Sequence, residues 1–203
     1  MNKKILALSI FVILLILLII FLVKSDTQSK SESSSLIVGN TVLVNKLENL
    51  YNATLVRDLT LQDISGIDEM VKGDDYGQDK YDEVKWFIEN NEQIHLSHSI
   101  TALEVYASTG QKIYCMPHEM SHIRVYMKHN AENNVKQVLE ESDENLREWQ
   151  TYVKQTKKTN PSYFSNYEEI NTKIKDALSK LKNGDRSKNI SSDIYYIETY
   201  GVC

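Results

Sequence analysis

The sequence predicts a mainly α-helical protein in which an N-terminal transmembrane helix precedes an antiparallel bundle of about four helices. Three observations predict it. Residues 5–23 form one unbroken apolar run, and apolar residues recur at helical spacing through most of the chain that follows. Two prolines and seven glycines in 203 residues are too few for a turn-rich all-β protein. A minor two-stranded patch at the C-terminus is the single β element that we expect.

The apolar run at residues 5–23 holds no charged side chain, and Ser9 is its one polar residue. A helix rises about 1.5 Å per residue, so a run of this length matches the roughly 30 Å hydrocarbon core of a bilayer. A cleaved signal peptide has a shorter apolar region and a small-residue cleavage site, whereas Lys24 lies inside the best site here. We therefore expect an uncleaved signal-anchor at residues 1–24, with a cleaved signal peptide as the alternative.

The residues around the run indicate its orientation. Lys3 and Lys4 precede it, and positive residues favour the cytoplasmic side. Residues 25–35 are rich in serine and have no apolar side chain to bury, which is typical of a flexible linker. The chain is thus expected to be a single-pass protein of the cell membrane, with a cytoplasmic N-terminus and an extracytoplasmic helical-bundle domain at residues 36–203.

The first half of that domain shows helical spacing at residues 36–59 and, more weakly, at residues 60–72. Residues 73–77 are expected to be a break. Asp79 is then expected to cap one long helix that continues to about Ser108.

The second half begins with Pro117, which fits the first position of a helix. This helix is expected to extend to about residue 158, either without interruption or with a break at the weak helix formers of residues 129–134. A last helix starts near residues 160–162 and stops at Gly184. The tail at residues 194–203 is rich in tyrosine and isoleucine, which favours the two-stranded patch.

The charge of the chain limits its partners. The formal net charge is −5, and charged residues of both signs make up 25% of the sequence without a basic stripe. Such a surface is a poor match for nucleic acid and is not attracted to anionic lipid head groups. We expect contact with the membrane through the N-terminal helix, a protein partner in the envelope, and no nucleic acid.

Two cysteines, Cys115 and Cys203, both follow the apolar run. A single pair of cysteines in a compartment that permits oxidation indicates one disulfide. The alternative is a pair of free thiols, which would fit the opposite topology.

The clearest chemical motif is the stretch His118-Glu119-Met120-Ser121-His122, which has the form H-E-x-x-H. Two histidines four residues apart share one helix face and can both bind one Zn²⁺ ion, and the intervening glutamate can act as general base. In these five residues the chain resembles the zincin metallopeptidases. The resemblance implies that His118 and His122 are zinc ligands and that Glu119 is the catalytic base.

A zinc site of this kind needs a third ligand. Residues 123–128 contain neither the glycine nor the third histidine of one zincin class. Glutamates at positions 140, 141 and 144 could serve only if the chain turns near residues 129–134. The alternative is that Glu119 stabilises a helix N-terminus and that His118 and His122 lie on a solvated face, opposite the apolar side chains.

A second pair of histidines, His95 and His98, falls with Asn91 on the apolar stripe of the preceding helix. Buried imidazoles need hydrogen bonds, an acidic partner or a metal. We expect a small polar layer inside the bundle, with a metal or ligand site as the alternative.

The function expected from these observations is non-enzymatic: a membrane-anchored extracytoplasmic domain that binds a partner or joins an envelope assembly. No resident cofactor is expected. One alternative is a membrane-anchored zinc hydrolase built on the His118–His122 stretch. The other is a sensor ectodomain, which would need a partner protein for its output.

Overall fold

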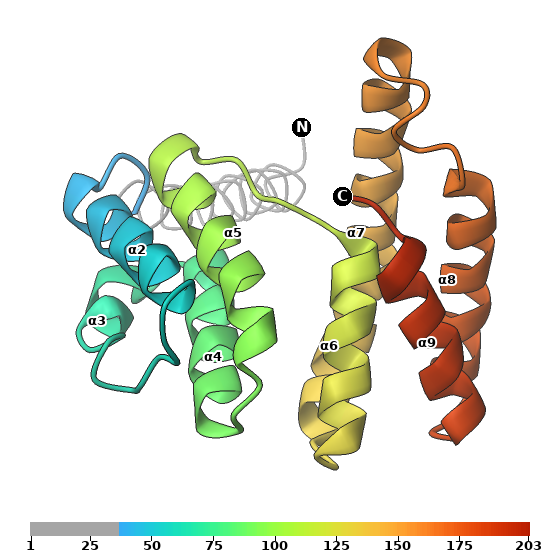
Figure 1. Ribbon diagram of the computed structural model, residues 1–203, viewed down its shortest axis with the longest axis horizontal. Coiled ribbons are helices and arrows are strands. Elements are labelled where there is room, and N and C mark those ends of the chain that lie inside the picture. The colour runs from blue at the N-terminus through green and yellow to red at the C-terminus, as the bar shows by residue number, and fades with distance from the viewer. Residues whose placement is uncertain (1–36) are drawn as a thin grey trace, which may run out of the picture. The chain divides into compact units, whose positions relative to one another are not determined.

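The computed structural model describes residues 37–203, which are helical throughout apart from turns and connections, with no strand among them (Figure 1). Contacts divide the chain into two compact units that meet between Lys112 and Ile113. None of the helices at residues 37–203 is long and apolar enough to cross a membrane. The predicted signal-anchor and linker, residues 1–35, lie outside the described residues.

At residues 37–112, the first unit contains four α-helices and one 3₁₀ turn: α2 (Thr41–Thr54), α3 (Ile67–Val71), α4 (Asp75–Glu89), η1 (Gln93–His95) and α5 (Leu96–Thr109). Helix α5 packs against both α2 and α4, and α3 packs against α4. The core of this unit comes from one face of each helix and includes the fully buried Leu43, Leu47, Phe87, Leu96 and Ile100.

Asp74 caps α4, so the expected cap at Asp79 is wrong. The Oδ1 atom of Asp74 accepts a hydrogen bond of 2.8 Å from the backbone N–H of Gly77, which satisfies one of the donors left unpaired at a helix start. The predicted break at residues 73–77 therefore ends at Asp74. Gly77 lies inside the helix, and glycine suits this position because a Cβ atom there would come within 2.7 Å of Ile37 Cδ1.

The expected single helix from Asp79 to Ser108 is also wrong. The chain breaks between α4 and α5, where Asn91 has a left-handed backbone with φ of 57°. The Gln93 side chain holds this corner, because it accepts a hydrogen bond from the backbone N–H of Leu59 and donates one to the same residue's carbonyl. Asparagine tolerates the left-handed region better than most residues, which explains why the turn occurs at this position.

The second unit contains four helices that run side by side in Figure 1: α6 (Met116–Lys128), α7 (Glu132–Thr159), α8 (Tyr167–Lys182) and α9 (Lys188–Tyr200). Helix α6 packs against α7 and α9, and α8 packs against the same two helices. Buried side chains from all four helices form the core, including Met120, Trp149, Ile174 and Ile194.

Of the two alternatives for the helix that carries His118 and His122, the structure has the break and not the continuous helix. Helix α6 ends at Lys128 and α7 begins at Glu132, with Asn130 in the left-handed region at φ of 55°. Gly184, the expected stop, follows the end of α8 with φ of 87°. Helix α8 begins only at Tyr167, several residues after the expected start.

The expected two-stranded patch is wrong, because residues 188–200 form α9. Three isoleucines, Ile190, Ile194 and Ile197, recur at helical spacing and are buried. Ser187 caps this helix by accepting a hydrogen bond from the backbone N–H of Ile190. Tertiary packing of this apolar face overrides the β propensity of the tail. The mainly α-helical class is confirmed, but the described residues hold eight α-helices, where about four were expected.

Candidate functional site

The H-E-x-x-H stretch lies in the first two turns of α6. The helix begins at Met116, and Pro117 at its start is compatible with a position where the backbone N–H has no helical partner. Met116, Met120 and Ile123 are fully buried on the side that packs within the second unit. This packing fixes the rotation of α6 and hence the direction of its polar side chains.

His118 and His122 lie next to each other on α6, as their spacing predicts. Their ring centroids are 4.1 Å apart, and the ring planes are inclined at 73°. The Glu119 carboxylate lies near His122, with 3.8 Å between Glu119 Oε2 and His122 Nδ1. The two imidazoles, which are donors suited to a divalent transition metal, thus lie next to each other on one stretch of helix, with the Glu119 carboxylate beside His122.

These side chains are not on a solvated face, so the surface alternative is wrong. His122 is completely buried, Glu119 is 9% exposed and His118 is half-buried. Electrostatic interactions are stronger away from water, and each buried polar group costs free energy unless it is compensated. The sequence pattern misses this burial because the apolar stripe of α6 covers only one side of the helix.

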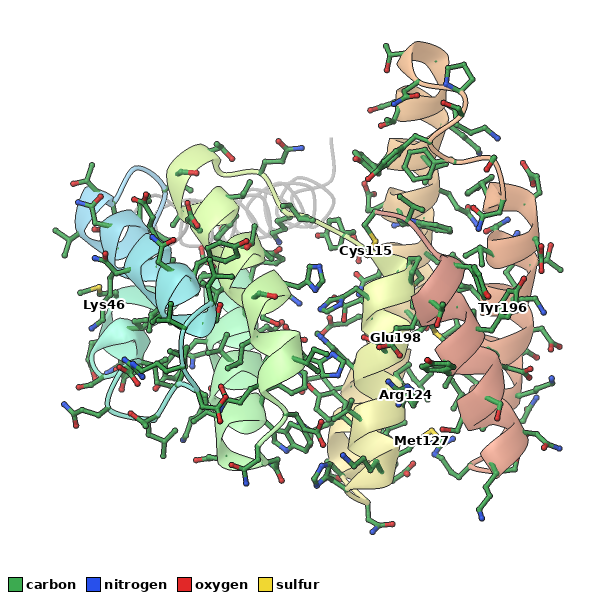
Figure 2. All side chains as sticks on the ribbon, in the orientation of Figure 1. Lys46, Cys115, Arg124, Met127, Tyr196 and Glu198 are labelled. Carbon is green, nitrogen blue, oxygen red and sulfur yellow. A yellow bond between two sulfur atoms is a disulfide. The ribbon has the colours of Figure 1, made fainter. Side chains whose placement is uncertain are left out.

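Contacts on other faces of α6 hold it within the second unit. Arg124 forms an ion pair with Glu198 of α9, in which its Nη2 atom donates a hydrogen bond of 2.6 Å and its Nε atom one of 3.0 Å (Figure 2). Inside α6 itself, Ser121 Oγ donates a hydrogen bond of 2.7 Å to the carbonyl oxygen of His118. The histidine pair is therefore placed on a well-anchored helix.

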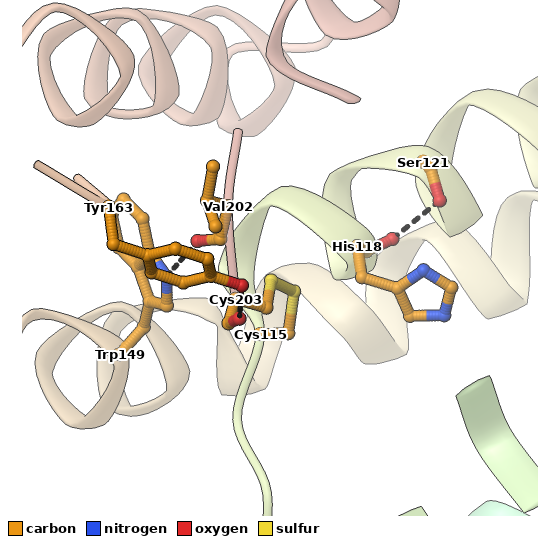
Figure 3. Close-up of a disulfide and its surroundings, with 7 residues drawn as sticks. All are labelled: Cys115, His118, Ser121, Trp149, Tyr163, Val202 and Cys203. Atoms are coloured by element: carbon orange, nitrogen blue, oxygen red, sulfur yellow. Dashed lines mark hydrogen bonds between the residues drawn. A yellow bond between two sulfur atoms is a disulfide. The ribbon is translucent and has the colours of Figure 1, made fainter. Parts of the chain in front are cut away.

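The disulfide predicted between Cys115 and Cys203 is confirmed, and it lies directly before α6 (Figure 3). The C-terminal residues are fastened beside it: Trp149 Nε1 donates to the carbonyl of Val202, and Tyr163 Oη donates to the carbonyl of Cys203, each at 3.3 Å. The start of α6 is consequently tied to the end of the chain, which stiffens the turn that carries His118.

The three glutamates considered as a third zinc ligand lie on α7, and all of them are exposed: Glu140, Glu141 and Glu144. Within residues 113–203, no third His, Cys, Asp or Glu lies close enough to the two histidines to complete a set of three metal ligands. The structure thus brings together His118, Glu119 and His122 but does not add these glutamates to them.

Both histidines of the second pair follow the break at Asn91, and they differ in exposure. His95 ends the 3₁₀ turn, is 5% exposed and packs its ring 5.4 Å from that of Phe87. His98 and Asn91 are exposed. The expected polar layer of Asn91, His95 and His98 therefore does not form, because His95 is the single buried side chain of the three.

A buried polar pair in the first unit was missed at the level of sequence. Tyr106 Oη donates a hydrogen bond of 2.7 Å to Asp74 Oδ2, and both side chains are at most 5% exposed. Burial raises the pKa of Tyr106 well above its usual range, and the hydrogen bond to Asp74 adds to this effect. The two residues are far apart in sequence, so no local pattern indicates that they meet.

Comparison with protein-family models, curated proteins and solved structures finds no significant match to this chain. Its function is therefore argued from its own residues.

Proposed function

We propose that this chain is a single-pass membrane protein whose helical units lie outside the cytoplasm and have a non-enzymatic binding or assembly role in the cell envelope. The uncharged run at residues 5–23 supports the anchor, because its length suits the hydrocarbon core of a bilayer. Lys3 and Lys4 before the run support a cytoplasmic N-terminus.

The observation that carries the proposal is the disulfide between Cys115 and Cys203. Their Cα atoms are 5.4 Å apart, within the usual range of about 4.4–6.8 Å for bonded cysteines. Disulfides form and persist in oxidising compartments and are rare in the cytosol. A disulfide that follows an apolar run therefore supports placement of the chain beyond the run on the outer side of the membrane.

Surface features support a binding role. The first unit has a groove of about 480 Å³ along α2, and its lining includes Asn45, Lys46 and Asn49 together with apolar residues. The second unit has a groove of about 330 Å³ between α7 and α8, whose lining includes Lys175 and Lys182. Both linings combine polar and apolar side chains, as the surfaces that contact protein partners do.

The zinc hydrolase is less well supported as a function. A zincin-type site needs a third protein ligand about 2.0–2.2 Å from the metal. The exposed positions of the glutamates on α7 do not supply it. A binding role requires no such ligand.

Topology is tested by labelling single thiols in intact cells with a membrane-impermeant maleimide. In the Cys115→Ser variant, the exposed Cys203 is the one remaining thiol. We expect it to be labelled before lysis. The matched control carries Asn2→Cys with both native cysteines replaced by serine, and it is expected to react only after lysis. Labelling of Cys203 only after lysis would contradict the proposed location.

The proposed binding or assembly role is tested by chemical cross-linking of the full-length chain in its native membrane, followed by purification. We expect a defined cross-linked complex that is retained when Glu119 is replaced by glutamine, because a binding role does not use a general base. A complex or phenotype that depends on the Glu119 carboxylate together with measurable peptide hydrolysis would instead favour the hydrolase.

A further inference from the structure

We propose that His118 and His122 bind one divalent transition-metal ion of the zinc class, and that Glu119 is a positioning residue for His122. The inference names a ligand for the binding protein proposed above, and in that sense it rests on the proposed function. All three residues belong to α6, so the metal site does not depend on the side of the membrane on which the protein lies.

The geometry of the two rings carries the proposal. Imidazole nitrogens bind Zn²⁺ at about 2.0–2.1 Å, so two of them in a tetrahedral site are roughly 3.4 Å apart. Ring centroids 4.1 Å apart allow this separation after small side-chain rotations. Residues four apart on a helix already face the same direction, so little conformational entropy is lost when an ion joins them.

Burial favours occupancy by a cation. His122 is completely buried, and Glu119 is 9% exposed beside it. A carboxylate held away from water stabilises a nearby positive charge more strongly than an exposed one does. The two imidazoles fill two coordination positions, and the remaining positions are left to water or to other donors.

Glu119 has a role different from the one that the zincin resemblance implies. Its Oε2 atom lies 3.8 Å from Nδ1 of His122, which leaves Nε2 as the ligating atom of that ring. Histidines that bind metals commonly give their second ring N–H to a carboxylate, which fixes the tautomer and the ring orientation. The distance of 3.8 Å is longer than a hydrogen bond, so Glu119 has to move closer to His122 when the ion binds. On that basis we assign Glu119 to the orientation of His122, with no hydrolytic step attached to the site.

The test uses the full-length protein in detergent, stripped of metal with a chelator and then titrated with Zn²⁺ in a calorimeter. We expect one ion per chain. The changes His118→Ala and His122→Ala are each expected to weaken binding by roughly 10-fold or more, since each removes one of the ligands. The matched control is His98→Ala, which replaces an exposed histidine in the other unit and should leave the affinity unchanged.

The positioning role is tested separately with Glu119→Gln. We expect the stoichiometry to remain one while affinity falls roughly 10- to 100-fold. The visible spectrum of bound Co²⁺ should also shift, which a merely structural role of Glu119 would not produce. An unchanged affinity and spectrum would remove Glu119 from the site.

Wild-type protein loaded with Zn²⁺ provides a measurement that does not depend on the folding of any variant. X-ray absorption should show scattering from at least two imidazoles around the ion. Absence of stoichiometric Zn²⁺ binding, or a site without imidazole ligands, would overturn the metal proposal. The thiol-labelling result would stand in that case, so failure of the metal site and failure of the proposed location are distinguishable.

Discussion

The buried hydrogen bond from Tyr106 to Asp74 shows how one residue pair stabilises the first unit. Asp74 receives the Gly77 backbone N–H through Oδ1 and the Tyr106 hydroxyl through Oδ2. Its two oxygens therefore cap α4 and attach that helix to α5. A carboxylate buried in this way depends on both donors, because a lost donor leaves a desolvated acceptor.

Replacing Tyr106 with phenylalanine is expected to destabilise the protein by about 1–3 kcal/mol, because it removes the hydroxyl donor while keeping the ring. Urea denaturation followed by circular dichroism measures the change. The control is Tyr195→Phe, since that tyrosine is 60% exposed on α9. Equal stabilities of the two variants would show that the buried bond contributes nothing.

The raised pKa of Tyr106 predicts a loss of stability in alkali. Tyrosine in the unfolded chain ionises near pH 10, whereas the folded protein retains this proton to higher pH. The contribution is therefore fully present below about pH 10 and is lost as the pH rises through the native pKa. We expect the free energy of unfolding to fall more steeply above pH 10 in the parent than in Tyr106→Phe. Parallel pH curves would contradict this.

Gly201 lies where no side chain fits. A Cβ atom at this position would come within 2.5 Å of both the Ile197 carbonyl oxygen and Pro117 Cβ. Gly201→Ala should therefore destabilise the second unit by about 1–3 kcal/mol, the usual cost of overpacking. Thermal unfolding measures it, with Ser192→Ala on the exposed side of α9 as the control. A melting temperature equal to that of the control would show that the tail can move away from Pro117.

At the scale of elements, the break between α4 and α5 decides the fold of the first unit. Helical spacing continues across residues 79–108, so periodicity alone predicts one long helix. The left-handed turn at Asn91 folds the chain back, which lets α5 contact α4 and α2. The turn is stabilised by tertiary hydrogen bonds from Gln93, which a local pattern does not reveal.

This break is tested by substitutions at Asn91. Asn91→Ala is expected to cost about 1–2 kcal/mol, because a β-carbon without a polar side chain disfavours the left-handed region. Asn91→Gly should be neutral or stabilising, since glycine adopts φ of 57° without strain. Urea denaturation measures the free energies of unfolding of the two variants. Alanine as stable as glycine would mean that the turn is not strained.

In helix α9, tertiary packing outweighs the β propensity of the residues. Tyrosine and isoleucine favour strands, yet the isoleucines at 190, 194 and 197 are also spaced for a helix. Whether this segment forms a strand or a helix depends on the surface against which it packs, and α6 and α8 provide a surface that suits a helix. Short apolar segments are ambiguous for this reason.

At the scale of the whole molecule, the disulfide joins residues of one unit only. Cys115 and Cys203 are 88 residues apart, and both belong to the second unit. Closing a loop of this size stabilises a fold by about 4 kcal/mol in the chain-entropy model. Reduction should therefore lower the unfolding temperature of the second unit and leave the first unit little changed.

Hydrogen exchange with and without reductant locates this effect. Faster exchange is expected in α9 and in the last three residues, whereas α2 to α5 should keep their protection. The double variant Cys115→Ser with Cys203→Ser, which does not respond to reductant, controls for effects of the reductant itself. Loss of protection in both units would contradict an effect confined to one.

The sequence by itself determined the helical class, the start of α6 within one residue of Pro117, the stop at Gly184 and the pairing of the two cysteines. These follow from local physical chemistry: helical periodicity, the missing N–H of proline, the free φ of glycine and the number of thiols. It also determined that His118 and His122 share a helix face. Only the tertiary structure decided the division into two units, the helical state of the tail, and the burial of His122 and Glu119. Each of these depends on contacts between residues distant in the chain, and such contacts leave no local periodic signal.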